Sequence, residues 1–334
     1  MNLLITGVAG FIGFHLTKLR LEQGDTVIGI DNLNNYYDVN LKQARLAQLQ
    51  AFANFIFYPD DIADGESLNH IFKTHQPQRV VNLAAQAGVR YSLSNPHVYV
   101  QSNVVGFTNI IEACRHHGVE HLVYASTSSV YGANKSQPNK EEDATNHPLT
   151  IYAATKKANE LIAHSYSNLY QLPTTGLRFF TVYGPWGRPD MAFFSFTRDI
   201  LQGKPIQVYN FGKMQRDFTY IDDIVTGISL AIDDVAQANP DWSGLTPDAA
   251  SSSAPYRIYN IGCGAPVNLL DYIKAIERAI GKMAIKEFLP MQDGDVLSTH
   301  ADTTRLQNNT GYKASVNFEE GVARFVAWYR DFYQ

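Results

Sequence analysis

A glycine-rich turn near the N-terminus constrains the fold of this chain more than any other feature. The segment TGVAGFIG, residues 6–13, follows the apolar run Leu3–Thr6 and opens the helical pattern Phe11–Gln23. Glycine allows the positive φ and the close backbone approach that such a strand-to-helix turn requires. The free N–H groups and positive dipole end of the helix can then hold a phosphate. The segment therefore predicts a dinucleotide-binding unit whose backbone cradles a pyrophosphate.

Each glycine of this turn has a separate expected task. Gly7 makes the turn, Gly10 lets the backbone approach the pyrophosphate, and Gly13 lets the helix pack close to the sheet. Asp31 follows the next apolar run, Thr26–Ile30. A carboxylate there accepts hydrogen bonds from an adenosine ribose and repels a 2′-phosphate, so it favours NAD over NADP. The alternative is a glycine-rich helix start that binds no ligand.

Apolar runs and helical patterns alternate through the first half of the chain. The expected strands are Leu3–Thr6, Thr26–Ile30, Phe55–Tyr58, Arg79–Ala84, His121–Ser126 and Thr174–Phe180, and the helical patterns between them are Phe11–Gln23, Leu41–Phe52, Leu68–His75, Asn103–His117 and Ala153–Leu169. This order is typical of a parallel sheet with helices on both faces. We expect an α/β fold, a Rossmann-type doubly wound parallel sheet with a smaller mixed α/β substrate domain toward the C-terminus.

The second half of the chain is less regular, which suggests a division into two domains. We expect residues 1–178 to form the NAD-binding domain and residues 179–334 to form mainly the substrate domain. The segments at about 217–235 and 256–262 are expected to return to the first domain. Gln237–Pro255 is polar and rich in Pro, Ser and Ala, which favours an exposed excursion. Further helices are expected at Phe194–Gln202, Asp222–Ile232, Leu269–Ile280 and Glu319–Tyr329.

Composition and charge exclude several other classes of protein. The chain is 45% hydrophobic and 18% charged, which is ordinary globular composition. Since no apolar run approaches the about 18–20 residues of a membrane helix and the N-terminus does not resemble a secretory signal, we expect a cytoplasmic protein with no membrane partner. A net charge of −5 without a basic run argues against nucleic acid as a partner. The two cysteines, Cys114 and Cys263, are far apart and predict neither a disulfide framework nor a metal site.

A tyrosine with a lysine four residues later gives the candidate catalytic pair. Tyr152 and Lys156 begin a helical pattern, so their side chains share one helix face. The nearby ammonium favours the phenolate, and the positive nicotinamide ring would act in the same direction, so we expect both to lower the pKa of Tyr152 from its usual value of about 10. The alternative is a core tyrosine beside a solvated lysine. Two other pairs with this spacing contain a glycine and lie in loop-like sequence, Tyr131/Lys135 and Tyr209/Lys213.

Hydroxyl side chains gather just before this helix, at the end of an expected strand. They lie in the segment ASTSSVYG, residues 125–132. Ligands of open parallel sheets lie beyond the carboxyl ends of the strands. One of these hydroxyls can therefore hydrogen-bond the substrate oxygen that Tyr152 deprotonates. The alternative is that they cap the following turn.

Together these features resemble the extended short-chain dehydrogenase/reductase family, and more narrowly its NAD-dependent UDP-glucuronate 4-epimerases. The resemblance spans about residues 2–333 and includes the segments TGVAGFIG, GIDNLNNYYDVNLK, NLAAQAGVRYS, STSSVYG, YAATKKANE, LRFFTVYGPWGRPDMA, KMQRDFTYIDD, SSAPYRIYNIG and FLPMQDGDV. It implies reversible C4 epimerisation of a UDP-hexuronic acid, UDP-glucuronate to UDP-galacturonate, through a transient 4-keto intermediate with tightly bound NAD. It also implies a homodimer in which the helices at Asn103–His117 and Ala153–Leu169 meet, and a place in polysaccharide biosynthesis.

The resemblance also assigns roles to individual residues. It makes Tyr152 the catalytic base and Lys156 the residue that lowers its pKa, with Thr127 and Ser129 beside the reacting sugar. The residues implied to bind NAD are Gly7, Gly10, Phe11, Ile12, Gly13, Asp31, Asn32, Asp61, Ile62, Leu83, Ala84, Ala85, Gln86, Asn103, Ser126, Tyr152 and Lys156. The residues implied to bind the UDP-sugar are Arg90, Thr127, Ser129, Thr181, Arg188, Arg216 and Asp295.

Related enzymes run other reactions through a 4-keto sugar, and two positions separate this chain from them. Dehydratases carry an Asp-Glu pair directly after the threonine, and UDP-xylose-forming decarboxylases carry a glutamate two residues after it. This chain has Ser128 and Ser129 there, which cannot act as acid or base near neutral pH. Arg188 could pair with a uronate carboxylate, with Arg90 as a second candidate, while Arg216 would bind the diphosphate. Neutral-hexose epimerases typically carry Asn where Thr181 stands. A UDP-glucose/UDP-N-acetylglucosamine 4-epimerase and a non-catalytic NAD-binding regulatory module are the alternatives.

Overall fold

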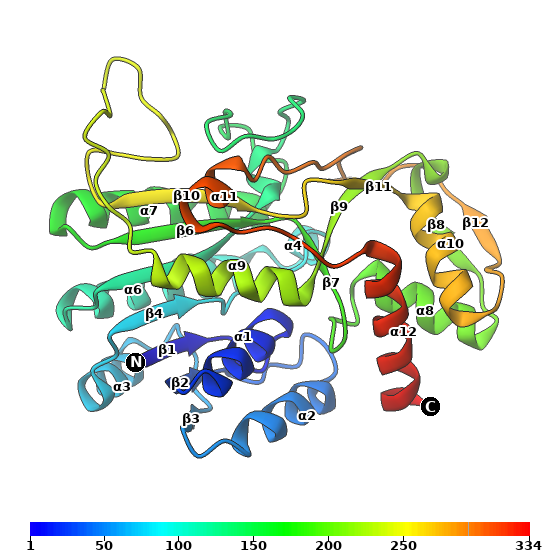
Figure 1. Cartoon of the computed structure of the whole chain (residues 1–334), viewed down its shortest axis with the longest axis horizontal. Coiled ribbons are helices and arrows are strands. Elements are labelled where there is room, and N and C mark those ends of the chain that lie inside the picture. Colours follow the sequence, from blue (N-terminus) through cyan, green and yellow to red (C-terminus); the bar gives the residue numbers. More distant parts are fainter. Residues whose placement is uncertain (293) are drawn as a thin grey trace.

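A seven-stranded parallel sheet forms the centre of the protein, as a computed structural model of residues 1–292 and 294–334 shows (Figure 1). The strand order is β10-β6-β5-β4-β1-β2-β3, and every neighbouring pair is parallel. This order confirms the predicted doubly wound Rossmann-type sheet. The strands are β1 (Asn2–Thr6), β2 (Thr26–Ile30), β3 (Phe55–Tyr58), β4 (Arg79–Asn82), β5 (His121–Thr127), β6 (Thr174–Phe179) and β10 (Tyr256–Ile261).

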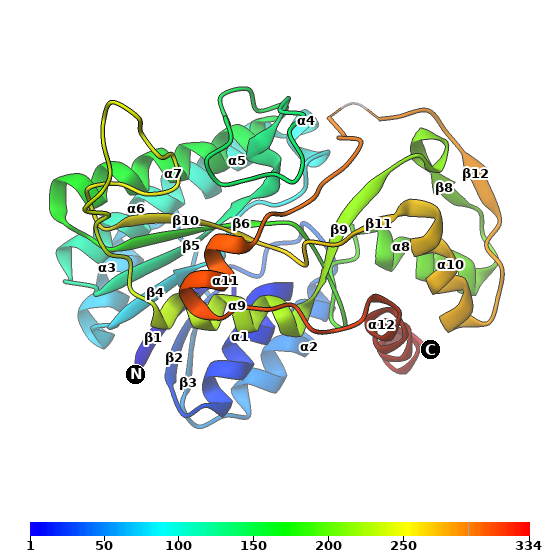
Figure 2. The ribbon, with the colours of Figure 1, turned by 45° about the horizontal axis from the view of Figure 1, so that its top comes forward.

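Helices cover both faces of this sheet (Figure 2). Leu3 and Ile5 of β1 pack into one apolar cluster and Leu4 packs into the other, because successive side chains of a strand point to opposite faces. No helix within the described residues is both long and apolar enough to cross a membrane. The covering helices are α1 (Phe11–Glu22), α2 (Val39–Gln50) and α9 (Ile221–Asp233) on one face, and α3 (Gly65–His75), α6 (Gly106–His116) and α7 (Ile151–Tyr170) on the other.

A smaller mixed α/β region follows the sixth strand, as predicted. In its three-stranded sheet, of order β11-β9-β7, β9 pairs parallel with β7 and antiparallel with β11. The pattern analysis did not predict these strands. β7 and β11 have three residues each, too few to show a periodicity, whereas β9 has six. The elements are β7 (Thr181–Tyr183), α8 (Ala192–Gln202), β8 (Ile206–Val208), β9 (Gln215–Tyr220), β11 (Pro266–Asn268), α10 (Leu269–Ile280), β12 (Lys286–Phe288) and α12 (Phe318–Tyr333). Helix α11 (Thr304–Thr310) packs instead against β10 and α9 of the larger region.

Two predicted segments differ from the structure. The helix expected at Asn103–His117 begins as a π-helical turn, η1 (Val100–Val105), and continues as α6; two short helices, α4 (Tyr91–Ser94) and α5 (Pro96–Tyr99), precede it. The segment Gln237–Pro255 projects from the surface as expected, with Leu245 94% exposed, but its base is anchored. Ala250, Ser252 and Ala254 are buried there, and Asp248 pairs with Arg305.

Candidate active site

The glycine-rich turn joins β1 to α1 and leaves no room for side chains. Gly7 has a φ of +76°, and a Cβ on it would lie 2.8 Å from the backbone nitrogen of Ala84. A Cβ on Gly13 would lie 2.0 Å from the carbonyl oxygen of Gly7, and one on Gly10 would lie 2.9 Å from the same oxygen. The backbone therefore folds back on itself at all three positions. Helix α1 then starts without a capping side chain, so its first N–H groups can bind phosphate.

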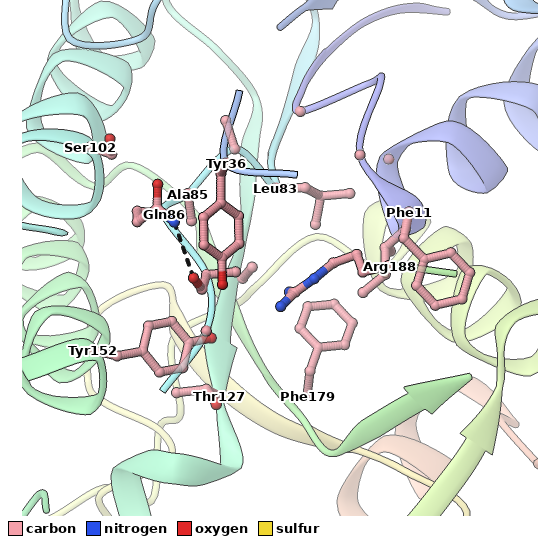
Figure 3. Close-up of a pocket in the computed structure, with 18 of the residues that line it drawn as sticks. Phe11, Tyr36, Leu83, Ala85, Gln86, Ser102, Thr127, Tyr152, Phe179 and Arg188 are labelled. Carbon is pink, nitrogen blue, oxygen red and sulfur yellow. Dashed lines mark hydrogen bonds between the residues drawn. The ribbon is translucent and has the colours of Figure 1, made fainter. Parts of the chain in front are cut away.

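A cavity of about 380 Å³ lies beyond the carboxyl ends of the parallel strands, beside this turn (Figure 3). It brings together all but one of the residues predicted to bind NAD: Gly7, Gly10, Phe11, Ile12, Gly13, Asp31, Asn32, Asp61, Ile62, Leu83, Ala84, Ala85, Gln86, Ser126, Tyr152 and Lys156. The exception is Asn103, which is buried behind the wall. Its side chain accepts a hydrogen bond from the Gln86 N–H and donates to the Gln86 carbonyl and to Thr155 Oγ1. Asn103 therefore holds the wall in place.

Asp31 links the glycine-rich turn to the loop after β2. Its Oδ2 accepts a hydrogen bond from the Ala9 N–H at 3.0 Å, and its Oδ1 accepts one from the Leu33 N–H at 2.9 Å. Burial raises the pKa of Asp31 above its usual value, while these N–H donors and the charge of Lys42 oppose the shift. A carboxylate oxygen has more than one lone pair, so Asp31 can still accept from a ribose diol. Asp61 stands close by and accepts from Asn32 at 2.8 Å.

Tyr152 and Lys156 lie on the first turns of α7, and both line the cavity. The Tyr152 hydroxyl points toward Thr127 (Figure 3). Burial raises the pKa of Tyr152 above its usual value, while the hydrogen bond to Thr127 and the charge of Arg188 lower it. Lys156 is not among the groups that shift this pKa in the chain by itself, so the lowering expected from Lys156 together with a nicotinamide ring stays a prediction. Loss of solvation favours the neutral phenol more strongly than its neighbours favour the phenolate.

Lys156 supplies a buried ammonium group with no charged neighbour among the described residues. Its side chain is 2% exposed, and burial alone lowers its pKa to about 8. A buried cationic donor without an acceptor is costly unless a ligand supplies one. Lys156, the glycine cradle and Asp31 together fit a dinucleotide, because they offer donors to a ribose, room for a pyrophosphate and an acceptor for a second ribose.

Two hydroxyls at the end of β5 have structural partners. Ser126 donates to Glu160 Oε1 at 2.6 Å, and Glu160 is paired with Arg178. Thr127 accepts from the Ser129 N–H at 3.2 Å, which caps the 3₁₀ turn η2 (Ser128–Tyr131). The capping alternative therefore holds for Thr127. Its side chain lines the cavity as well, so the same residue can also meet a ligand.

A second cavity of about 1200 Å³ adjoins the first and reaches into the smaller region. Six of the seven residues predicted to bind the UDP-sugar line it: Arg90, Ser129, Thr181, Arg188, Arg216 and Asp295. Thr127 lines the first cavity instead, and Ser129, Thr181 and Arg188 line both. Arg90 contacts Asp295 at 3.4 Å and stacks 5.2 Å above the Tyr209 ring, so both neighbours hold its guanidinium at the wall of this cavity.

Two further residues of the site were missed by the sequence analysis. Tyr36 lines both cavities, and Asp190 holds Arg188 in an ion pair. Both lie in segments that carried the family resemblance, GIDNLNNYYDVNLK and LRFFTVYGPWGRPDMA. Neither belongs to a spacing with its own chemical meaning, so the resemblance was the only signal that could have indicated them.

Known proteins resemble this chain along its whole length. A probable UDP-glucuronate 4-epimerase of Rhizobium meliloti is 48% identical over 335 residues, covering 100% of this chain and 98% of that protein. The crystal structure of UDP-glucuronic acid 4-epimerase from Bacillus cereus, in complex with UDP-glucuronic acid and NAD, is 32% identical, with a TM-score of 0.88 and full coverage of both chains. That of UDP-glucose 4-epimerase from Thermotoga maritima, with UDP-glucose, is 29% identical, with a TM-score of 0.86 and full coverage of both chains.

The family assignment agrees with the geometry of the first cavity. Residues 3–262 match the NAD dependent epimerase/dehydratase family, and this range contains the glycine cradle, Asp31, Tyr152 and Lys156. The chain belongs to the NAD-dependent epimerase/dehydratase family, and NAD is its cofactor.

Proposed function

We propose that this protein reversibly inverts C4 of UDP-glucuronate to give UDP-galacturonate, through a transient 4-keto sugar and with NAD held throughout. The observation that carries the proposal is the position of Tyr152 and Thr127, in a dinucleotide-fitting cavity that shares its wall with a larger, arginine-lined one. The names of the Rhizobium meliloti and Bacillus cereus relatives support this choice of substrate. The Thermotoga maritima enzyme has nearly the same fold, so fold alone does not choose between the sugars.

In the proposed mechanism the residues of the chain transfer a proton and stabilise the negative charge that forms on Tyr152. NAD, when bound, supplies a reversible hydride acceptor for the sugar C4. Tyr152 Oη removes the proton of the C4 hydroxyl and later returns it. Thr127 Oγ1 hydrogen-bonds the same oxygen, and the Lys156 ammonium stabilises the phenolate and holds the nicotinamide ribose.

Between the two transfers the keto sugar has to turn over. We propose that Arg216 and Arg90 hold the diphosphate while the keto sugar rotates. Most of the binding free energy then comes from contacts with the nucleotide, and the sugar stays free to move. Burial lowers the pKa of Arg216, whose Nη1 donates to the carbonyls of Gln215 and Leu297, so its guanidinium is fixed in place. Ser128 and Ser129 line both cavities, and neither carries the carboxylate that related enzymes have at these positions, which disfavours water loss or decarboxylation at C5 and C6.

Nuclear magnetic resonance of intact substrates tests this function. Purified protein is incubated separately with UDP-glucuronate, UDP-glucose and UDP-N-acetylglucosamine, and the anomeric proton signals are followed. We expect UDP-glucuronate to give UDP-galacturonate signals and to approach the same ratio from either side, with the other two sugars converted far more slowly. Faster conversion of UDP-glucose or UDP-N-acetylglucosamine would show that this sugar, and not UDP-glucuronate, is the substrate. No conversion of any sugar by NAD-loaded protein would favour a non-catalytic module.

The proposal includes a division of the chain into two domains and a cytoplasmic location. We assign residues 1–178 to the NAD-binding domain, with 217–235 and 256–262 returning to it, and 179–334 mainly to the substrate domain. Pairing of β10 with β6 and packing of α9 on α1 support the returns, although β9 lies in the small sheet. Both cysteines are free, which suits a reducing compartment. A hexuronate product would suit polysaccharide biosynthesis.

We also propose that the protein is a homodimer. Large apolar side chains are exposed on α7 and on the π-helical turn before α6: Leu161 is 60% exposed, Leu169 67%, Val100 46% and Val105 38%. Water contact with such side chains is unfavourable, and a two-fold axis would bury both copies of the face at once.

Replacing Leu161 with glutamate should convert the dimer to monomer, because it would bury two carboxylates in the contact. Light scattering coupled to size-exclusion chromatography measures the mass, and circular dichroism checks the fold. Leu245→Glu is the matched control, since Leu245 is 94% exposed at the tip of the 237–255 loop. A wild-type protein that runs as a monomer at micromolar concentration would contradict the proposal.

A further inference from the structure

Arg188, the proposed partner of the uronate carboxylate, is held by one edge only. Its Nε donates to Asp190 Oδ1 at 3.0 Å, and its Nη2 donates to Asp190 Oδ2 at 2.5 Å. A guanidinium has five N–H donors in one plane, so Nη1 and the second hydrogen of Nη2 remain for another carboxylate. Figure 3 shows this side chain extending into the cavity between Tyr36 and Phe179.

Asp190 is itself held from across the site. Tyr36 Oη donates to Asp190 Oδ2 at 3.2 Å, so this oxygen accepts hydrogen bonds from both the Tyr36 phenol and the Arg188 guanidinium. Tyr36 comes from the loop between β2 and α2, whereas Asp190 comes from the loop between β7 and α8. The contact therefore connects a wall of the NAD cavity with the loop that carries Arg188.

Gly88 provides the space for this contact. It has a φ of +97°, and a Cβ there would lie 2.3 Å from Tyr36 Oη and 3.7 Å from Asp190 Oδ2. A side chain at this position would displace the phenol from Asp190. Three loops far apart in the sequence thus meet around one ion pair, which is a more specific arrangement than a surface salt bridge requires.

The side chains of the pair are only partly buried, at 23% exposure for Arg188 and 28% for Asp190. An ion pair with this exposure adds little to folding stability. Its geometric effect is larger, because a long arginine side chain loses rotamer freedom whenever it is fixed in one orientation. If Arg188 is already fixed in the folded protein, this loss of side-chain entropy does not reduce the free energy of substrate binding.

We propose that Asp190 and Tyr36 are positioning residues that hold Arg188 with its unused edge toward the carboxylate of UDP-glucuronate, and so favour a uronate over a neutral sugar. This inference rests on the proposed function. Asp190 touches neither sugar nor cofactor in this scheme and acts only through Arg188. The opposite possibility is competition, in which Asp190 occupies the guanidinium and has to be displaced by the substrate.

A double-mutant cycle separates positioning from competition. Isothermal titration calorimetry measures the affinity of NAD-loaded protein for UDP-glucuronate and for UDP, which lacks the carboxylate. We expect Asp190→Asn to weaken UDP-glucuronate binding by about tenfold and to leave UDP binding unchanged. Tyr36→Phe should act in the same direction by about threefold. In an Arg188→Ala background both substitutions should have no further effect, and in single variants KM should rise while kcat changes little.

Each other result overturns the inference. Tighter binding of UDP-glucuronate by Asp190→Asn would show competition, and an equal loss for UDP would show general distortion of the site. Additive losses in the Arg188→Ala background would show that Asp190 acts independently. If Asp190→Asn does not fold, Tyr36→Phe decides through the same cycle. Asp271→Asn, in an exposed ion pair with Lys274, is the matched control. Wild-type protein that does not bind UDP-glucuronate would overturn the proposed function itself, together with this inference.

Discussion

Replacing Tyr152 with phenylalanine is expected to lower the rate of C4 epimerisation by about a thousandfold, within the range that a general acid–base group contributes. The substitution removes one oxygen atom and keeps the ring that packs edge-on to Tyr99 at 6.1 Å between centroids. Thr127 cannot replace the lost base, because an aliphatic hydroxyl does not ionise near neutral pH. Lys156 is mainly a donor at pH 7, since its pKa is about 8.

The loss should be confined to the chemical step. Absorbance of NAD released on denaturation should show the same cofactor content as in wild type, and the melting temperature should change little. Tyr170→Phe is a suitable control, because Tyr170 ends the same helix, is 46% exposed and lines neither cavity. Turnover of UDP-glucuronate by Tyr152→Phe near the wild-type rate would remove Tyr152 from the mechanism.

The pKa of Tyr152 shows where sequence reasoning fails for this site. The spacing of Tyr152 and Lys156 correctly predicts that both lie on one helix and face one cavity. The direction of the pKa shift depends on burial, which the spacing does not determine. In the chain alone burial outweighs the favourable neighbours and raises the pKa of the phenol. A lowered pKa would require charge that a bound ligand contributes.

The fold was more accessible to prediction because its signals are local. Strands buried on both faces appear as apolar runs, so β2 begins and ends at the predicted residues. β3 also has the predicted bounds, although it is a partly exposed edge strand. The short strands β8, β11 and β12 have three residues each and no such signal. The π-helical turn η1 also follows from packing: Asn103 bonds to Gln86 and Thr155, far along the chain.

Contacts between distant loops were the least predictable part of the site. Asp31 and the glycine-rich turn were found because a single supersecondary unit contains both. Tyr36, Gly88 and Asp190 meet only after the sheet has assembled, so no spacing relates them. Arg45 is a similar case: its buried guanidinium donates to the carbonyl of Ala9 in the glycine-rich turn and to that of Trp186 beside the Arg188 loop.

Replacing Gly13 with alanine is expected to lower the affinity for NAD by about a hundredfold or more, the scale of losing about 3 kcal/mol of binding. The added Cβ would lie 2.0 Å from the Gly7 carbonyl oxygen and 3.2 Å from the Val8 Cα. Both neighbours are backbone, so the methyl group cannot be accommodated by a side-chain rotation. Either α1 moves away from the turn or the turn opens, and both changes displace the N–H groups that face the pyrophosphate.

The matched control is Gly65→Ala at the first residue of α3, where the nearest atom to a new Cβ is a side-chain oxygen of Asn109 at 3.6 Å. That variant should keep its NAD and melt at or slightly above the wild-type temperature, because alanine favours a helix over glycine by up to about 1 kcal/mol. Gly13→Ala should melt several degrees lower and be purified with little NAD, and both quantities are measured on the same sample. If Gly13→Ala lowered the melting temperature yet retained full NAD, the glycine would serve folding alone. The affinity for NAD would then come from other polar residues of the cavity, Lys156 and Asp31 among them.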